Sequence, residues 1–205
     1  MHLTSALVDY AEACAARKST PGGGSASALV GAVGASLGEM AATFTSSCDD
    51  PSAVEEGLDQ LRRVREAVLP LVDLDCEAYK KVGAALALPK DSSAAKRVRR
   101  ERLQAALAGS LDVPLRCARL CVEGLEILDG MAEHLNPNLV TDTACAALFL
   151  TASFRASWYN VEVNLKVIKK GEGEDGLRTE GKDLARRATE LQENILKKAD
   201  VILAG

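Results

Sequence analysis

The sequence predicts an all-α fold, a bundle of long, partly kinked helices that form one domain over residues 1–205. Three observations predict it. Aromatic residues make up only 3% of the chain while Ala and Leu abound, a balance that favours interlocking helices over a β-sandwich. No segment shows the apolar–polar alternation of a half-buried strand. Apolar residues amount to 47%, which is enough for a core.

Caps and breakers place the first two helices. Thr4 or Ser5 is the expected cap of a first helix that ends near Arg17. A turn of one proline and three glycines follows. Ser25 is expected to cap a second helix that ends near Ser46.

Two internal prolines are expected to kink the next two helices, because proline removes a backbone donor and crowds the preceding turn. After a loop at 48–52, a third helix is expected over 53–88, with an interruption at Pro70. A fourth helix is expected over 93–134, with Pro114 in its interior.

The last two helices are expected on either side of an acidic loop at 171–176. The fifth follows a turn at 136–138 and ends near Lys170. The sixth covers 177–204 and carries these apolar residues along one side: Leu184, Ala188, Leu191, Ile195 and Ile202. Helices this long cannot cover all their apolar stripes within a 205-residue monomer, so we expect a homodimer formed by helix packing.

Small residues dominate the stretch T-P-G-G-G-S-A-S-A-L-V-G-A-V-G-A-S-L-G-E-M at 20–40. Gly31, Gly34 and Gly38 recur at helical spacing and leave one side of the helix nearly bare, so a neighbouring helix or a flat ligand can approach closely. The glycine turn before them offers free amides for an anion or a carbonyl group. A tight turn that serves helix packing explains the same glycines, and both interpretations stay open.

Charge and cysteine content limit the classes of partner. The net charge of −4 indicates no general nucleic-acid surface. A local basic cluster is either a solvated helix face or a docking patch for an anionic substrate tail, and consists of Lys96, Arg97, Arg99, Arg100 and Arg102. The six cysteines form no C-x-x-C pair and only two histidines accompany them, which favours small buried side chains in a reducing compartment over disulfides or a metal site.

The apolar stretches do not have the pattern of membrane spans. The uncharged stretch 26–38 is too short to cross a bilayer, and 143–161 carries Arg155 near its middle. The first residues lack the basic leader of a signal peptide. We therefore expect a soluble, cytoplasmic protein.

A carboxylate interrupts the apolar face of the expected third helix. The stripe reads Leu61, Val64, Val68, Leu71, Asp75, Ala78 and Val82. Because an anion is costly to desolvate, Asp75 needs a partner or a raised pKa. It is either a structural hydrogen-bond hub or a proton-transfer group.

A second carboxylate, Asp142, opens the fifth helix, where capping is its simplest role. It also begins a polar stripe that continues through Ser153, Ser157, Asn160 and Asn164. Asp142 and Asn160 stand ~27 Å apart along the helix axis, so they cannot both touch one reacting atom. Either an elongated ligand binds, or only one end of the stripe is the site.

Several segments together resemble the cyclodeaminase/cyclohydrolase family, which comprises the C-terminal domain of formiminotransferase-cyclodeaminase and free-standing bacterial methenyltetrahydrofolate cyclohydrolases. They follow the family's order over most of the chain: 20–37, L-V-D-L-D-C-E-A-Y (71–79), A-L-P-K (87–90), R-R-E-R-L-Q-A-A-L (99–107), D-V-P-L (112–115), N-P-N-L-V-T-D (136–142) and N-V-E-V-N-L (160–165). Thr141 stands where the family often has Ser, and it keeps the hydroxyl. We expect no formiminotransferase domain in a chain of this length.

The resemblance implies a helical homodimer that binds a tetrahydrofolate derivative in a cleft near the dimer interface, with no metal and no further cofactor. Asp75 or Asp142 would be the catalytic proton carrier. Lys90 and Arg99 would attract the glutamate tail. The other implied substrate-binding residues are Gly22, Gly23, Gly24, Ser25, Gln104, Asn160 and Asn164.

Two reactions are implied. A cyclodeaminase closes 5-formiminotetrahydrofolate to 5,10-methenyltetrahydrofolate and releases ammonia, and this is the leading expectation. A cyclohydrolase opens the methenyl compound with water to 10-formyltetrahydrofolate. The alternatives from other classes are a non-catalytic helical interaction module and an inactive folate-binding relic, although the presence of both Asp75 and Asp142 argues against the relic.

Overall fold

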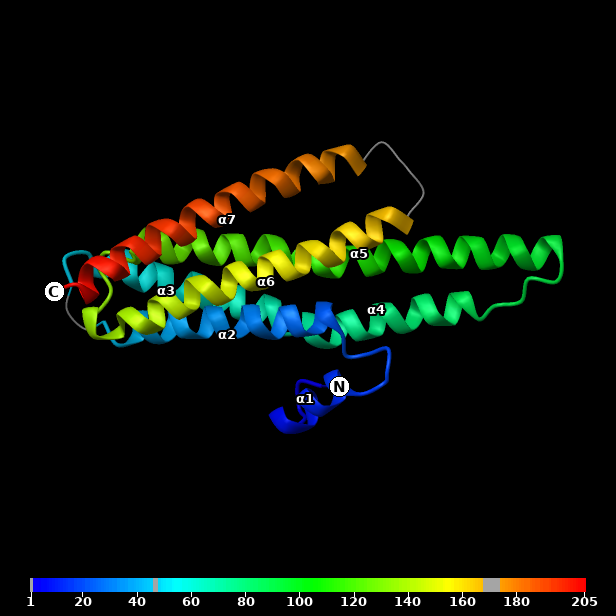
Figure 1. The fold of residues 1–205 in the computed structure, drawn as a ribbon, viewed down its shortest axis with the longest axis horizontal. Helices are drawn as coiled ribbons and strands as arrows, with labels where there is room; N and C mark the ends of the chain where they lie inside the picture. The colour runs from blue at the N-terminus through cyan, green and yellow to red at the C-terminus, as the bar shows by residue number, and fades with distance from the viewer. Residues whose placement is uncertain (1, 46–47, 168–173) are drawn as a thin grey trace.

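The computed structural model describes residues 2–45, 48–167 and 174–205, and these ranges contain helices and no strand (Figure 1). The all-α prediction is therefore confirmed. The elements are α1 (Leu7–Ala15), α2 (Gly23–Thr43), α3 (Pro51–Val68), α4 (Leu71–Leu86), α5 (Ser93–Met131), the short 3₁₀ helix η1 (Pro137–Leu139), α6 (Val140–Val167) and α7 (Glu174–Leu203).

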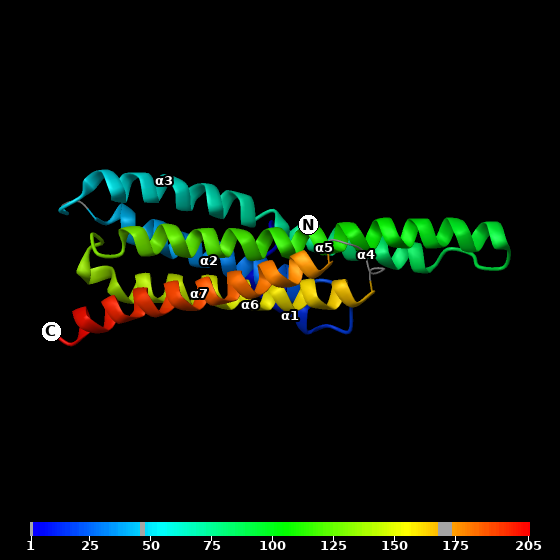
Figure 2. The same cartoon turned by 90° about the horizontal axis from the view of Figure 1, so that it is seen from above.

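The long helix α5 runs along the whole bundle, and α3 and α4 lie one after the other beside it (Figures 1 and 2). The expected interruption at Pro70 is confirmed, and it divides the predicted third helix into α3 and α4. Pro114 lies inside α5, as predicted. Beyond the other helices, α4 and the N-terminal half of α5 project together as a two-helix arm (Figure 2).

The glycine stripe of α2 lies against α6, which runs antiparallel to it. A Cβ at Gly31 would lie 2.7 Å from Ser153 Oγ, and a Cβ at Gly34 would lie 3.0 Å from the backbone nitrogen of Leu150. Both values are shorter than ordinary contacts, so side chains at these positions would push the helices apart. Close approach by a neighbouring helix is thus confirmed, and a flat ligand has no room on this stripe.

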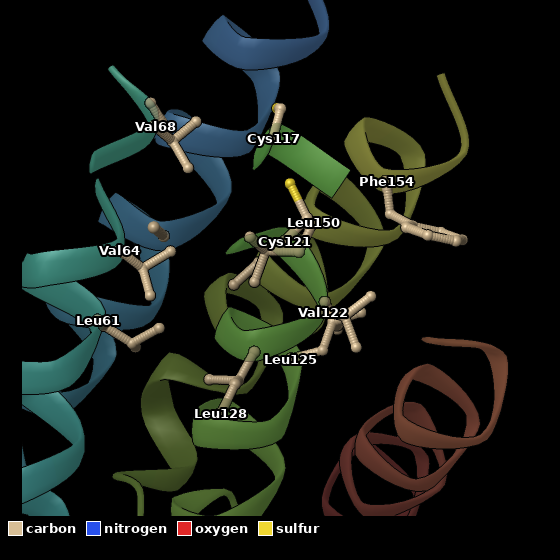
Figure 3. Close-up of a cluster of buried hydrophobic side chains, with 14 of the residues drawn as sticks. Leu61, Val64, Val68, Cys117, Cys121, Val122, Leu125, Leu128, Leu150 and Phe154 are labelled. Carbon is tan, nitrogen blue, oxygen red and sulfur yellow. The ribbon is translucent and has the colours of Figure 1, made fainter. Parts of the chain in front are cut away.

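The main core lies where α3, α5 and α6 meet beside α2 (Figure 3). The apolar stripe predicted around Asp75 contributes to it, because its leucines and valines on α3 are buried. The labelled core residues are Leu61, Val64, Val68, Cys117, Cys121, Val122, Leu125, Leu128, Leu150 and Phe154.

Two predicted helix caps are wrong. The N-cap of α1 is Ala6, without a side-chain hydrogen bond, because the Ser5 hydroxyl instead donates to the carbonyl of His2 at 2.7 Å. The N-cap of α2 is Gly22, and Ser25 lies inside the first turn with its side chain fully buried. In both cases a hydroxyl that the sequence offered as a cap bonds elsewhere in the fold.

Other boundaries differ by a few residues. Helix α5 ends at Met131, before the predicted His134. Helix α7 begins at Glu174, so the last part of the predicted acidic loop is helical, which is favourable because acidic side chains at a helix N-terminus interact well with its dipole. The predicted ends at Ser46 and Lys170, and residues 171–173 of that loop, lie outside the described residues.

Two helical stretches, Gly23–Thr43 and Pro137–Lys166, are long and apolar enough to cross a membrane by length and composition alone. They are α2 and the η1–α6 segment, which pack against each other inside the bundle. Core helices of soluble proteins meet the same criterion, and about half of each stretch is buried here.

Candidate active site at the glycine turn

The Asp75 carboxylate lies directly against the first turn of α2. A Cβ at Gly24 would stand 2.6 Å from Asp75 Cγ and 2.8 Å from Asp75 Oδ2, so only glycine permits this arrangement. The backbone N–H of Ser25 donates a hydrogen bond to the same carboxylate. The helix N-terminus and a carboxylate from α4 thus form one polar centre.

Two opposing effects act on Asp75. Burial raises the pKa of the Asp75 carboxyl, and the hydrogen bond from the Ser25 N–H opposes that shift. Burial is the larger effect, so the proton is held to a higher pH than on an ordinary aspartate. A half-buried carboxyl with a raised pKa can both accept and return a proton, which is what proton-transfer chemistry requires.

Ser25 connects this centre to the N-terminal helix. Its Oγ lies 2.9 Å from the Tyr10 hydroxyl, and both side chains are buried. Ser25 also hydrogen-bonds the Cys76 thiol, whose pKa is raised by burial. The sequence analysis did not find Tyr10, because no spacing or motif links α1 to the glycine turn.

Asn160 joins the same centre from α6. A Cβ at Gly23 would lie 3.5 Å from Asn160 Nδ2, and this amide donates to the carbonyl of Ala156 at 2.9 Å. Asn164, one turn further along α6, donates to the carbonyl of Ser110 on α5 at 3.0 Å. The structure therefore brings the glycine turn, Asp75 and Asn160 together, and places Asn164 next to them on the α5 side.

The predicted cationic residues lie along the two-helix arm. Lys90 is exposed in the loop after α4, and Arg99 Nε donates to the carbonyl of Leu86 at 3.3 Å. Gln104 is half-buried on α5. Along the arm runs an open groove of about 410 Å³, lined by Lys81, Ala84, Ala85, Leu88, Arg102, Ala105 and Ala106. Lys81 is a cation of this arm that the sequence analysis missed.

Within one chain, Asp142 lies far from this centre. It is half-buried in the first turn of α6, ~27 Å along the helix from Asn160. Between them, Ser153 Oγ donates to the carbonyl of Ser27 at 2.6 Å, and Ser157 is fully buried. The middle of the polar stripe is closed inside the core, so no elongated ligand can lie along it within one subunit.

The chain matches known proteins over most of its length. The family model described as formiminotransferase-cyclodeaminase matches residues 6–200. The chain belongs to this family. It is 34% identical over 161 residues to the methenyltetrahydrofolate cyclohydrolase of Methylorubrum extorquens, covering 77% of each chain.

The chain is also similar to family members that are named as cyclodeaminases. The crystal structure of formiminotetrahydrofolate cyclodeaminase from Thermotoga maritima has a TM-score of 0.85 and 28% identity, with 98% of each chain covered. The formimidoyltransferase-cyclodeaminase of Rattus norvegicus is 28% identical over 168 residues, and the match spans 80% of this chain but 31% of that protein. The predicted family resemblance is confirmed.

The family's matched region includes every element of the candidate site, from Tyr10 on α1 to Asn164 on α6. Among the described residues, no three His, Cys, Asp or Glu side chains come together as metal ligands would. The polar groups at the glycine turn include one carboxyl, backbone amides and the Asn160 amide. Such groups suit an organic substrate with ring nitrogens and carbonyl oxygens.

Proposed function

We propose that the chain is a folate one-carbon enzyme that converts 5-formiminotetrahydrofolate to 5,10-methenyltetrahydrofolate and ammonia, with Asp75 as the proton carrier. The observation that carries the proposal is the half-buried Asp75 carboxyl, held against Gly24 and the Ser25 N–H, with its pKa raised by burial. The similarity to the cyclodeaminase structure over 98% of both chains supports the choice of reaction.

The reaction needs one proton moved over a short distance. N10 attacks the carbon of the formimino group, whose nitrogen is protonated, and forms the new C–N bond, and Asp75 takes the proton that N10 loses. Asp75 then gives this proton to the leaving nitrogen, the old C–N bond breaks, and ammonia departs from the methenyl cation. General acid–base help of this kind contributes roughly 10²–10⁴-fold in rate.

The residues around Asp75 have distinct roles in this proposal. The free amides of Gly23 and Gly24 and the Asn160 side chain would hold the pterin by hydrogen bonds. The groove of the arm would take the remainder of the substrate, with Lys81 and Arg102 facing its carboxylates. Arg99, which lies further along the arm, would attract the glutamate tail.

A second reaction is supported by the 34% identical relative named methenyltetrahydrofolate cyclohydrolase. There, water attacks the methenyl carbon and Asp75 accepts a proton from that water. Asp75 then gives this proton to N5, the C–N5 bond breaks, and the remaining hydroxyl loses its proton as the formyl C=O forms. The products are 10-formyltetrahydrofolate and one released proton. The same carboxyl serves both directions of proton transfer, so the two reactions need the same residues.

Near-ultraviolet absorbance of the methenyl compound distinguishes them. A cyclodeaminase makes this band appear with 5-formiminotetrahydrofolate, whereas a cyclohydrolase makes it disappear with the methenyl substrate faster than in buffer. Asp75→Asn should lower the rate at least about 100-fold in the active assay. If the wild-type protein changes the absorbance in neither assay and shows no saturable binding of a reduced folate, the chain is better described as a non-catalytic helical interaction module.

We also propose a homodimer through the outer face of α2 and α6, because this face is apolar and exposed. It is formed by Val30, Val33, Leu148, Phe149, Tyr159 and Val163. Asp142 lies in the first turn of α6 and Lys166 in its last turn. Antiparallel packing of α6 on its copy would bring the oppositely charged ends of the two helices to the same side, whereas parallel packing would bring like charges together.

This arrangement gives Asp142 a role in the site of the other subunit. A two-fold axis near the middle of α6 would bring Asp142 of one subunit beside Asn160 of the other, although they lie ~27 Å apart in one chain. A doubly tagged heterodimer of Asp75→Asn and Asp142→Asn subunits tests it. One of its two sites is intact, so about half the wild-type activity is expected. If Asp142 acts in its own subunit, activity stays lost, and normal rates in Asp142→Asn alone would remove it from catalysis.

A further inference from the structure

Tyr10 is the one buried residue of α1. The helix is short and mostly exposed, with Leu7 74% and Val8 67% accessible, so it does not dock through a broad apolar face. Figure 1 shows α1 standing at the side of the bundle near the start of α2. Its buried contact therefore depends on a single aromatic ring whose hydroxyl reaches the glycine turn.

The Tyr10 hydroxyl acts on Asp75 through one intermediate residue. It lies 2.9 Å from Ser25 Oγ, and the backbone N–H of Ser25 donates to the Asp75 carboxylate. Ser25 is fully buried, so its hydroxyl has no access to water as a replacement partner. Burial raises the pKa of Tyr10 to about 12, and the phenol therefore keeps its proton throughout the ordinary pH range.

A displacement of Ser25 would shift the N–H group that donates to the Asp75 carboxylate. The carboxylate already lies against Gly24, where a Cβ would stand 2.6 Å from Cγ, so it follows the position of this turn. A misplacement of ~1 Å at a reacting group lowers rates by as much as roughly 100-fold. A group that fixes the turn therefore contributes to catalysis without touching the substrate.

We propose that Tyr10 is a positioning residue for Asp75, which fixes Ser25 and through it the carboxylate at the start of α2. The inference rests on the proposed role of Asp75 in proton transfer. It assigns the N-terminal helix to the active site, as the element that holds the glycine turn in place.

Tyr10→Phe is the direct test, because it removes the hydroxyl and keeps the ring. The turnover number should fall roughly tenfold while KM changes less. Without the Tyr10 hydroxyl, Ser25 is less firmly placed, and the hydrogen bond from its N–H to the ionised Asp75 carboxylate weakens. The pKa of Asp75 then rises, so the acidic limb of the pH–rate profile should move to higher pH. Unchanged turnover and an unchanged acidic limb would overturn the proposal.

Asp73→Asn is the matched control. The backbone N–H of His2 donates to Asp73, so this variant weakens the other anchor of the N-terminal segment without touching Ser25. Asp73→Asn should not move the acidic limb to higher pH, because removing a nearby negative charge favours the ionised form of Asp75. If it reproduces the kinetic changes of Tyr10→Phe, general loosening of the segment explains both, and the specific role of Tyr10 is wrong.

A measurement without substrate separates this inference from the proposed function. The pH titration of the Ser25 amide resonance reports the ionisation of Asp75, and its midpoint should rise in Tyr10→Phe. Other groups near this centre are also charged or titratable, namely Cys76, Cys117, Asp73 and Lys80. In a Cys117→Ala background, Tyr10→Phe should still raise the midpoint of the Ser25 amide titration. A raised midpoint with no folate turnover would reject the function alone, and an unmoved midpoint would reject the positioning role.

Discussion

Gly24→Ala tests the contact on which the candidate site depends. The new Cβ would lie 2.6 Å from Asp75 Cγ, whereas ordinary contact begins at 3.4 Å, so the carboxyl carbon must move by about 0.8 Å or more. That shift pulls the carboxylate from the Ser25 N–H and should lower turnover by roughly 100-fold. Overpacking should cost about 1–3 kcal/mol of unfolding free energy, partly offset by the ~0.5–1 kcal/mol that alanine gains over glycine in a helix.

Denaturant unfolding and the absorbance assay measure the two effects. Gly83→Ala on α4 is the control, because its Cβ meets no atom within 4 Å, and it should keep wild-type turnover and gain stability. In an Asp75→Ala background the collision is absent, so Gly24→Ala should no longer destabilise the fold. An equal cost in both backgrounds would refute the contact, and wild-type turnover in Gly24→Ala would refute the placement of Asp75.

Three further predictions concern the same helices. Asp75→Asn should raise the melting temperature at pH 8, and the gain should shrink toward pH 4. A carboxyl with a raised pKa stabilises the fold only while it is protonated, and this stabilisation is lost as pH rises through its folded pKa. An equal gain in melting temperature at both pH values would contradict the prediction. Gly34→Ala should lower the free energy of unfolding by about 1–3 kcal/mol, since its Cβ presses on the Leu150 backbone. An unchanged free energy of unfolding would refute the tight α2–α6 packing. Ser153→Ala should cost about 0.5–1.5 kcal/mol in denaturant unfolding, because it removes the buried bond to the Ser27 carbonyl while that carbonyl keeps its partner within α2. A stabilising change would mean that this bond is dispensable.

Local patterns predicted most of the helices, since caps, prolines and apolar periodicity act over a few residues. The helix break at Pro70 and the position of Pro114 inside a helix were predicted, and the bare side of α2 was correctly interpreted as a surface for close packing. The caps at Ser5 and Ser25 were predicted wrongly because their hydroxyls bond to partners that the local pattern does not show.

Local patterns predicted the candidate site only in part, for the same reason. Asp75 was recognisable because a carboxylate on an apolar stripe is locally anomalous. Tyr10 was not, because its partner Ser25 is fifteen residues away across a turn whose path depends on tertiary packing.

The amino-acid order alone determined that this chain is helical, where its helices break, and which acid is out of place on an apolar face. These properties depend on neighbours within a turn or two of helix. Only the tertiary structure decided that Asp75 meets the first turn of α2, that Tyr10 supports that turn, and that Asp142 lies at the opposite end of α6. Distances between helices depend on how their side chains interlock, and that information is spread over the whole core.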